Sequence, residues 1–148
     1  MTTKKEQRLM MAYPNTETFT WYNANPKGKI IGDCVLRAIS TAEGESWETT
    51  YKKMFDFSIK RGEIFNDKKL IEAYLKSIGY TKMKQPRKMN NKKYTGSDWC
   101  KELQRMGNTK TIIANIGEHH IVCIKENKIL DIWNSTCKCI GNYWIRVE

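Results

Sequence analysis

The sequence predicts an α+β domain in which N-terminal helices pack on a C-terminal antiparallel β-sheet. Apolar residues recur at three- and four-residue intervals through most of the chain up to residue 107, which is typical of helices with one buried face. From residue 111 onward they recur at every second position, which is typical of strands. A hydrophobic content of 40 % with 28 % charged residues is that of a folded globular chain.

The length of 148 residues is the usual size for one domain, so we predict a single domain over residues 1–148. The sequence contains no apolar run long enough for a signal peptide or a membrane span, and we therefore expect a cytoplasmic protein without a membrane partner. The cysteines are odd in number and lack framework spacing, so they are expected to be free thiols at positions 34, 100, 123, 137 and 139.

The N-terminal quarter contains little regular pattern. Residues 1–15 are polar and include a proline, which predicts a loose N-terminal arm. The alternating segment 18–22 predicts a short strand. A loop rich in turn-forming residues, 23–29, then leads the chain to Cys34 at the start of the first expected helix.

Four segments carry helical spacing, and each is followed by a glycine that can end a helix. Asp33 is suited to cap the first helix, and Ser46 and Ser97 are suited to cap the second and the fourth. The expected helices are 35–42, 47–60, 66–78 and 98–106.

A strongly basic segment separates the third and fourth expected helices. Residues 81–96 contain six Lys or Arg and no acidic residue, and they lack a sustained period, so we predict a basic surface loop. Together with a net charge of +10, this loop favours an acidic partner, and we expect a protein or peptide substrate. A nucleic-acid partner is not expected, because the sequence carries no recognition-helix or RNA-binding signature.

The last third of the sequence alternates between apolar and polar residues and predicts a meander of strands joined by short turns. The expected strands are 112–116, 119–124, 128–133 and 139–147.

Cys34 is the candidate nucleophile. A cysteine in the first turn of a helix lies at the positive end of the helix dipole, next to unpaired N–H groups, and both favour the thiolate. A thiolate also needs a base, and that base works best when a third polar group orients it. His120, at the start of an expected strand, and Asp131, on the next strand, supply these groups.

The register of the hairpin formed by segments 119–124 and 128–133 decides which residue can orient the histidine. A turn centred on residues 125–126 places Asp131 directly opposite His120, and a turn at 126–127 makes Asp131 its diagonal neighbour. A three-residue turn would instead bring Asn134 near His120, so Asn134 is the alternative orienter. His119 is the alternative base; we favour His120 because it continues the apolar row of its strand.

The order and context of these residues resemble the papain-like cysteine peptidases. Such proteins have a Cys at a helix start, a His opening a strand of a following sheet, and an Asn or Asp on the next strand. The chain also resembles small uncharacterised papain-like proteins of phages and bacteria. The segments that carry the resemblance are Gly32-Asp33-Cys34, His120-Ile121-Val122 and Asp131-Ile132-Trp133.

The resemblance implies a papain-like fold over about residues 19–147 and a Cys34, His120 and Asp131 triad. Larger peptidases of this kind carry a Gln six residues before the nucleophile to stabilise the oxyanion, whereas this chain has Gly28 there. Asn25 or Asn23 could supply an amide instead.

We therefore expect a cysteine hydrolase, a peptidase or isopeptidase that acts through a thioester intermediate. The alternative is a noncatalytic, phage-type binding protein that uses the fold and the basic loop to inhibit a component of host defence. No cofactor is expected. Cys137 and Cys139 could join Cys123 and a histidine as zinc ligands, but C-x-C is an unusual ligand spacing, so no metal is predicted.

Overall fold

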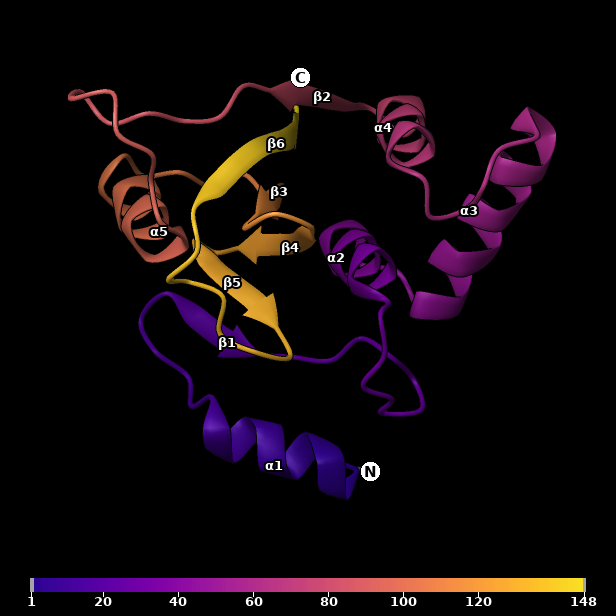
Figure 1. Cartoon of the computed structure of the whole chain (residues 1–148), viewed down its shortest axis with the longest axis horizontal. Coiled ribbons are helices and arrows are strands. Elements are labelled where there is room, and N and C mark those ends of the chain that lie inside the picture. Colours follow the sequence, from indigo (N-terminus) through magenta and orange to yellow (C-terminus); the bar gives the residue numbers. More distant parts are fainter. Residues whose placement is uncertain (1, 148) are drawn as a thin grey trace.

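A six-stranded mixed sheet forms the centre of the molecule (Figure 1). The structure is a computed structural model, and it describes residues 2–147. The strand order is β1-β5-β4-β3-β6-β2, and every neighbouring pair is antiparallel except β1 and β5. The strands are β1 Phe19–Trp21, β2 Tyr80–Met83, β3 Ile112–Ile116, β4 His120–Lys125, β5 Lys128–Asp131 and β6 Ile140–Arg146.

The α+β class is confirmed, but the expectation of an antiparallel, wholly C-terminal sheet is wrong. The two edge strands come from the first two thirds of the chain, and β1 runs parallel to β5 with Phe19 opposite Ile129. Both side chains are fully buried. This pairing joins segments about 110 residues apart, so no local pattern in the sequence could reveal it.

Helices cover both faces of the sheet, as Figure 1 shows. On one face, α2, α3 and α4 bury an apolar core that includes Leu36, Met54 and Leu75 against β-strand residues such as Cys123. On the other face, α5 packs Trp99 and its neighbours against the alternate residues of the same strands. The helices are α1 Lys4–Ala12, α2 Cys34–Glu43, α3 Trp47–Arg61, α4 Lys68–Ser77 and α5 Gly96–Arg105.

The four expected helices are present, with some caps displaced. Gly44 and Gly62 end α2 and α3 in the left-handed conformation that glycine adopts most easily. Ser46 caps α3 as expected, but Thr95 rather than Ser97 caps α5, because the Thr95 hydroxyl accepts the N–H of Asp98. The helices therefore begin within two residues of where their apolar spacing placed them.

The expected loose arm is wrong for residues 4–12, which form α1. Thr3 and Glu6 make a capping box, in which each side chain accepts the backbone N–H of the other. Glu6 is buried, and its second carboxylate oxygen accepts a hydrogen bond from the Asn23 side chain at 3.1 Å. Through this contact α1 supports the loop that leads to Cys34.

The basic segment 81–96 is only partly a loop. Its first residues belong to β2, which pairs with β6 at the edge of the sheet. The remainder carries no long regular element before Thr95, and Lys88 forms an ion pair with Asp98 at 2.8 Å. None of the helices within residues 2–147 has the length and apolar content needed to cross a bilayer.

Candidate active site

Cys34 is the first residue of α2, and no side chain at the N-cap position caps this helix. Asp33 occupies the N-cap position but makes no capping hydrogen bond, contrary to its expected role. Its carboxylate points elsewhere, accepting from Arg37 Nε at 2.8 Å, Trp47 Nε1 at 3.0 Å and Asn25 Nδ2 at 3.1 Å. The first-turn N–H groups therefore remain available to an anion at Cys34.

The hairpin of β4 and β5 determines what lies beside His120. Glu126 and Asn127 both have positive φ, 53° and 61°, and they form the two-residue turn that pairs Lys125 with Lys128. This is the register in which Asp131 is the diagonal neighbour of His120. The distance from His120 Nε2 to Asp131 Oδ2 is 2.5 Å.

Asn134, the alternative orienter, is engaged elsewhere. Its Oδ1 accepts hydrogen bonds from the backbone N–H and the hydroxyl of Thr136, which fixes the loop after β5. His119, the alternative base, lies exposed in the turn between β3 and β4. The structure therefore brings His120 and Asp131 together and leaves His119 and Asn134 outside this contact.

The apolar row of β4 does not explain why His120 lies beside Cys34, so the expectation that this row faces the nucleophile is wrong. Val122 and Ile124, which share its row, pack on the α5 side of the sheet, whereas Ile121 and Cys123 lie beneath α2. His120 reaches Cys34 because it is the first residue of β4, where the strand begins. The approach of His120 to Cys34 therefore depends on its position at the end of β4 and not on the face of the sheet to which its row belongs.

Asp131 is held by a residue to which the sequence analysis gave no role. Arg37 Nη1 donates to Asp131 Oδ1 at 2.6 Å, and the backbone N–H of Ile132 donates to the same oxygen at 2.7 Å. Arg37, Asp33 and Asp131 are all at least nine-tenths buried. An arginine on the buried side of α2, one turn after Cys34, was the signal that the sequence offered for this contact.

Burial and charge act in opposite directions on the two reactive groups. Burial by itself would raise the pKa of the Cys34 thiol, but His120, the backbone N–H of Ile121 and Arg37 together lower it below its ordinary value. Burial would lower the pKa of His120, but its interactions with Asp131 and Cys34 raise it to about 9. These shifts both favour a thiolate and imidazolium pair.

Three other features support Cys34 as the reactive cysteine. Burial raises the pKa of Cys100 and of Cys123 to about 12, so both thiols stay protonated. Cys137 and Cys139 are exposed, and neither lines the cavity at which Cys34 and His120 lie. The Trp133 ring lies 5.1 Å from the ring of His120, between centroids, and covers the imidazole.

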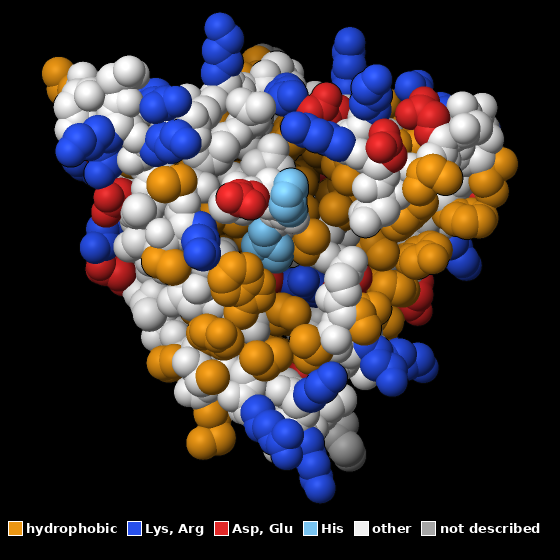
Figure 2. All heavy atoms as spheres, in the orientation of Figure 1, with side chains coloured by type: hydrophobic (Ala, Val, Ile, Leu, Met, Phe, Trp, Pro, Cys, Tyr) orange, Lys and Arg blue, Asp and Glu red, His pale blue; other side chains and the backbone are white. Residues whose placement is uncertain are grey.

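A cavity of about 510 Å³ opens at Cys34 and His120. Figure 2 shows the two histidines beside a hollow with hydrophobic side chains in its floor and charged groups around it. Asn66, Asn115 and Asn142 are among the residues that line this cavity. Asn115 is directly opposite Ile121, the residue whose N–H faces the thiol.

The two asparagines considered as oxyanion donors serve the loop instead. Asn23 donates to Glu6 and to the carbonyl of Lys29, while Asn25 binds Asp33 and accepts from two backbone N–H groups. Gly28 packs against α1 so closely that a Cβ there would lie 2.4 Å from Glu6 Oε1. A side chain at position 28 would first have to displace the side chains of Glu6 and Thr3.

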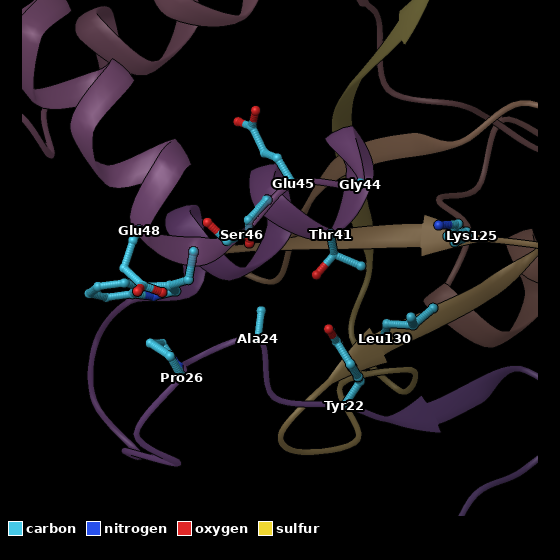
Figure 3. Close-up of a pocket in the computed structure, with 12 residues that line it drawn as sticks. Tyr22, Ala24, Pro26, Thr41, Gly44, Glu45, Ser46, Glu48, Lys125 and Leu130 are labelled. Atoms are coloured by element: carbon cyan, nitrogen blue, oxygen red, sulfur yellow. The ribbon is translucent and has the colours of Figure 1, made fainter.

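A second pocket, of about 500 Å³, lies at the other end of α2 (Figure 3). Tyr22, Thr41 and Leu130 line it, and none of the three triad residues does. Among residues 2–147, no group of three or more His, Cys, Asp or Glu side chains is arranged to hold a metal ion.

Comparisons of the chain with protein-family models, with curated proteins and with solved structures found no match.

Proposed function

We propose that this chain is a cysteine hydrolase of papain-like design that cleaves a peptide, isopeptide or related acyl bond. The observation that carries the proposal is that Cys34 and His120 line one cavity, and that His120 is hydrogen-bonded to Asp131, which Arg37 holds in turn. Hydrolysis by a cysteine nucleophile needs a reactive thiolate, a base, and a group that orients the base. Here the thiol lies at an uncapped helix start, and the base and the orienter follow it in this order. The intact order of these groups supports catalysis over simple packing.

In the first half of the reaction, the Cys34 thiolate attacks the substrate carbonyl carbon and a tetrahedral oxyanion forms. The backbone N–H of Cys34, at the positive end of α2, is one donor for that oxygen. Because Asp131 holds Nε2 of His120, Nδ1 is the ring nitrogen that serves the reacting atoms. It gives its proton to the leaving amine, the C–N bond breaks and a thioester remains on Cys34.

In the second half, neutral His120 takes a proton from water as the water oxygen attacks the thioester carbonyl. The tetrahedral intermediate expels the Cys34 thiolate and releases a carboxylic acid. The imidazolium and thiolate pair is thereby restored. Asp131 keeps the ring oriented in both halves, with Trp133 limiting access of water to their hydrogen bond.

The noncatalytic binding protein remains the second candidate, favoured by one observation. Gly28 stands where the resemblance expects a glutamine, and a side chain there would clash with the side chains of Glu6 and Thr3. Under this alternative, Cys34 would have no special reactivity, and its replacement by alanine would leave function intact. The reactivity of Cys34 therefore separates the two candidates.

The test is site-resolved alkylation by iodoacetamide, read by mass spectrometry between pH 5 and pH 10. Cys34 should react with iodoacetamide well below pH 8, and faster there than the exposed Cys137. His120→Ala should slow Cys34 at low pH. His119→Ala is the matched control and should change nothing. Cys34 reacting no faster than Cys137, in all three proteins, would reject the hydrolase.

A further inference from the structure

A second cavity lies next to the cavity at Cys34, along α4. The second has a volume of about 520 Å³, and Glu72 and Trp144 line both. It lies between α4 and the edge of the sheet formed by β2 and β6. We call it the α4 groove, defined by Lys69, Ala73, Lys76, Tyr80, Lys82 and Trp144.

The floor of the α4 groove is apolar and its rim is basic. Trp144 and Tyr80 are buried beneath it, and the Lys82 ammonium lies 5.9 Å from the centroid of the Trp144 ring. Glu72, the acidic residue of the groove, is paired with Lys82 at 2.6 Å. Within residues 2–147, the exposed Lys69 and Lys76 form no ion pair, so the groove carries uncompensated positive charge.

The spacing of the two free lysines fits an extended chain. Lys69 and Lys76 are seven residues apart on α4, which separates them by about 10 Å at 1.5 Å per helical residue. An extended peptide advances about 3.3 Å per residue, so acidic residues three positions apart match the lysine spacing. An apolar residue between those two acidic residues would then lie over the Trp144 floor.

We propose that the α4 groove binds an acidic segment of a polypeptide and leads the adjoining acyl bond to Cys34. The inference rests on the proposed function for its chemistry, because it names the substrate class of the same site. Charge complementarity and the shared wall of the two cavities, formed by Glu72 and Trp144, carry it. The partner is a protein or peptide with two acidic residues three positions apart and an apolar residue between them.

The binding test uses Cys34→Ala protein and fluorescein-labelled peptides containing Glu-Leu-Gly-Glu, Gln-Leu-Gly-Gln or Lys-Leu-Gly-Lys, read by fluorescence polarisation. Only the acidic peptide should bind well. Replacing both Lys69 and Lys76 by Gln should weaken binding about tenfold at low salt, because exposed ion pairs contribute up to a factor of about five each. Replacing Lys4 and Lys5 by Gln removes the same charge from α1, at the opposite end of the molecule (Figure 1), and should have little effect.

The same three peptides are then made with a reactive group, either a chloromethyl ketone at the C-terminus or a bromoacetyl group at the N-terminus. These reactive peptides are tested on protein in which Cys34 is intact. The two sets of peptides place the reactive group near Cys34 whichever way the peptide chain runs along the α4 groove. The acidic peptide in one set should label Cys34 faster than the neutral peptide, and the Lys69 and Lys76 double variant should lose this advantage. The reaction of Cys34 with iodoacetamide should be the same in the double variant as in the unchanged protein.

Equal binding of the three peptides, or no effect of the double variant, would overturn the groove proposal while leaving Cys34 chemistry intact. Stronger binding of a single-stranded oligonucleotide than of the acidic peptide would overturn it too. Acid-selective binding to a protein whose Cys34 has ordinary iodoacetamide reactivity would refute the hydrolase and leave the groove as a binding site.

Discussion

Replacing Arg37 by Gln should destabilise the protein strongly, because it leaves two buried carboxylates without their shared cation. Arg37 donates to Asp33 at 2.8 Å and to Asp131 at 2.6 Å, and the three side chains are 8 %, 4 % and 1 % exposed. Removing one partner of a buried ion pair typically costs about 3–5 kcal/mol. A domain of this size loses about 3 °C of melting temperature per kcal/mol, so we expect a decrease of roughly 10–15 °C.

The assay is urea and thermal unfolding of the Arg37→Gln protein, beside Arg105→Gln as the control. Arg105 also binds a carboxylate, that of Glu102, but its side chain is 71 % exposed, and loss of such a pair costs about 1 kcal/mol or less. Equal losses for Arg37→Gln and Arg105→Gln would refute the buried network.

Three further predictions concern the neighbours of the nucleophile. Asp131→Asn should lower the pKa of His120 from about 9 toward its ordinary value of 6.5, measured by NMR titration of the ring protons; an unchanged pKa would exclude Asp131 as its main partner. Gly28→Gln should destabilise by about 1–3 kcal/mol in urea unfolding rather than activate, since it adds a clash with α1 to positive-φ strain. Gly44→Ala, where φ is also 63° and the space is open, should show the backbone cost alone, and equal losses would argue against the clash. Asn115→Ala should weaken binding of a peptide aldehyde by about 100-fold, because the aldehyde adduct places an oxygen at the oxyanion position and Asn115, which lines the cavity, would donate to it. Alkylation of Cys34 should stay unchanged. Equal affinity of the two proteins for the aldehyde would exclude Asn115 as an oxyanion donor.

Elements with a strong local pattern could be predicted from the sequence. The apolar spacing and terminal glycines marked α2 and α3, and the apolar run 112–116 predicted β3 with its observed ends. The helix α1 was missed because its residues are polar, yet the capping box of Thr3 and Glu6 was present to be read. The strand β2 lies at an edge and alternates weakly, so its pairing with β6 depends on contacts distant in sequence.

The candidate site could be predicted where the order of residues along the chain determines geometry. A two-residue turn between β4 and β5 is enough to bring Asp131 near His120, whichever of two registers forms. The sequence offered Arg37 as an arginine on the buried side of α2, but its contact with Asp131 depends on how α2 lies across the end of the sheet. The prediction that the Asp33 side chain caps α2 is wrong for the same reason, since Arg37 and Trp47 bind its carboxylate.

The contact between Arg37 and Asp131 also bears on why a carboxylate can orient this histidine. A buried, unpaired carboxylate beside His120 would be costly in the free protein and would hold the imidazolium proton too strongly to release it. Arg37 shares the Asp131 charge through the second oxygen, so the pair remains compensated when His120 gives up its proton. Because Arg37 and Cys34 lie one turn apart on α2, the same helix positions the nucleophile and the anchor of the orienter. A displacement of α2 should therefore disturb the thiolate and the imidazolium together.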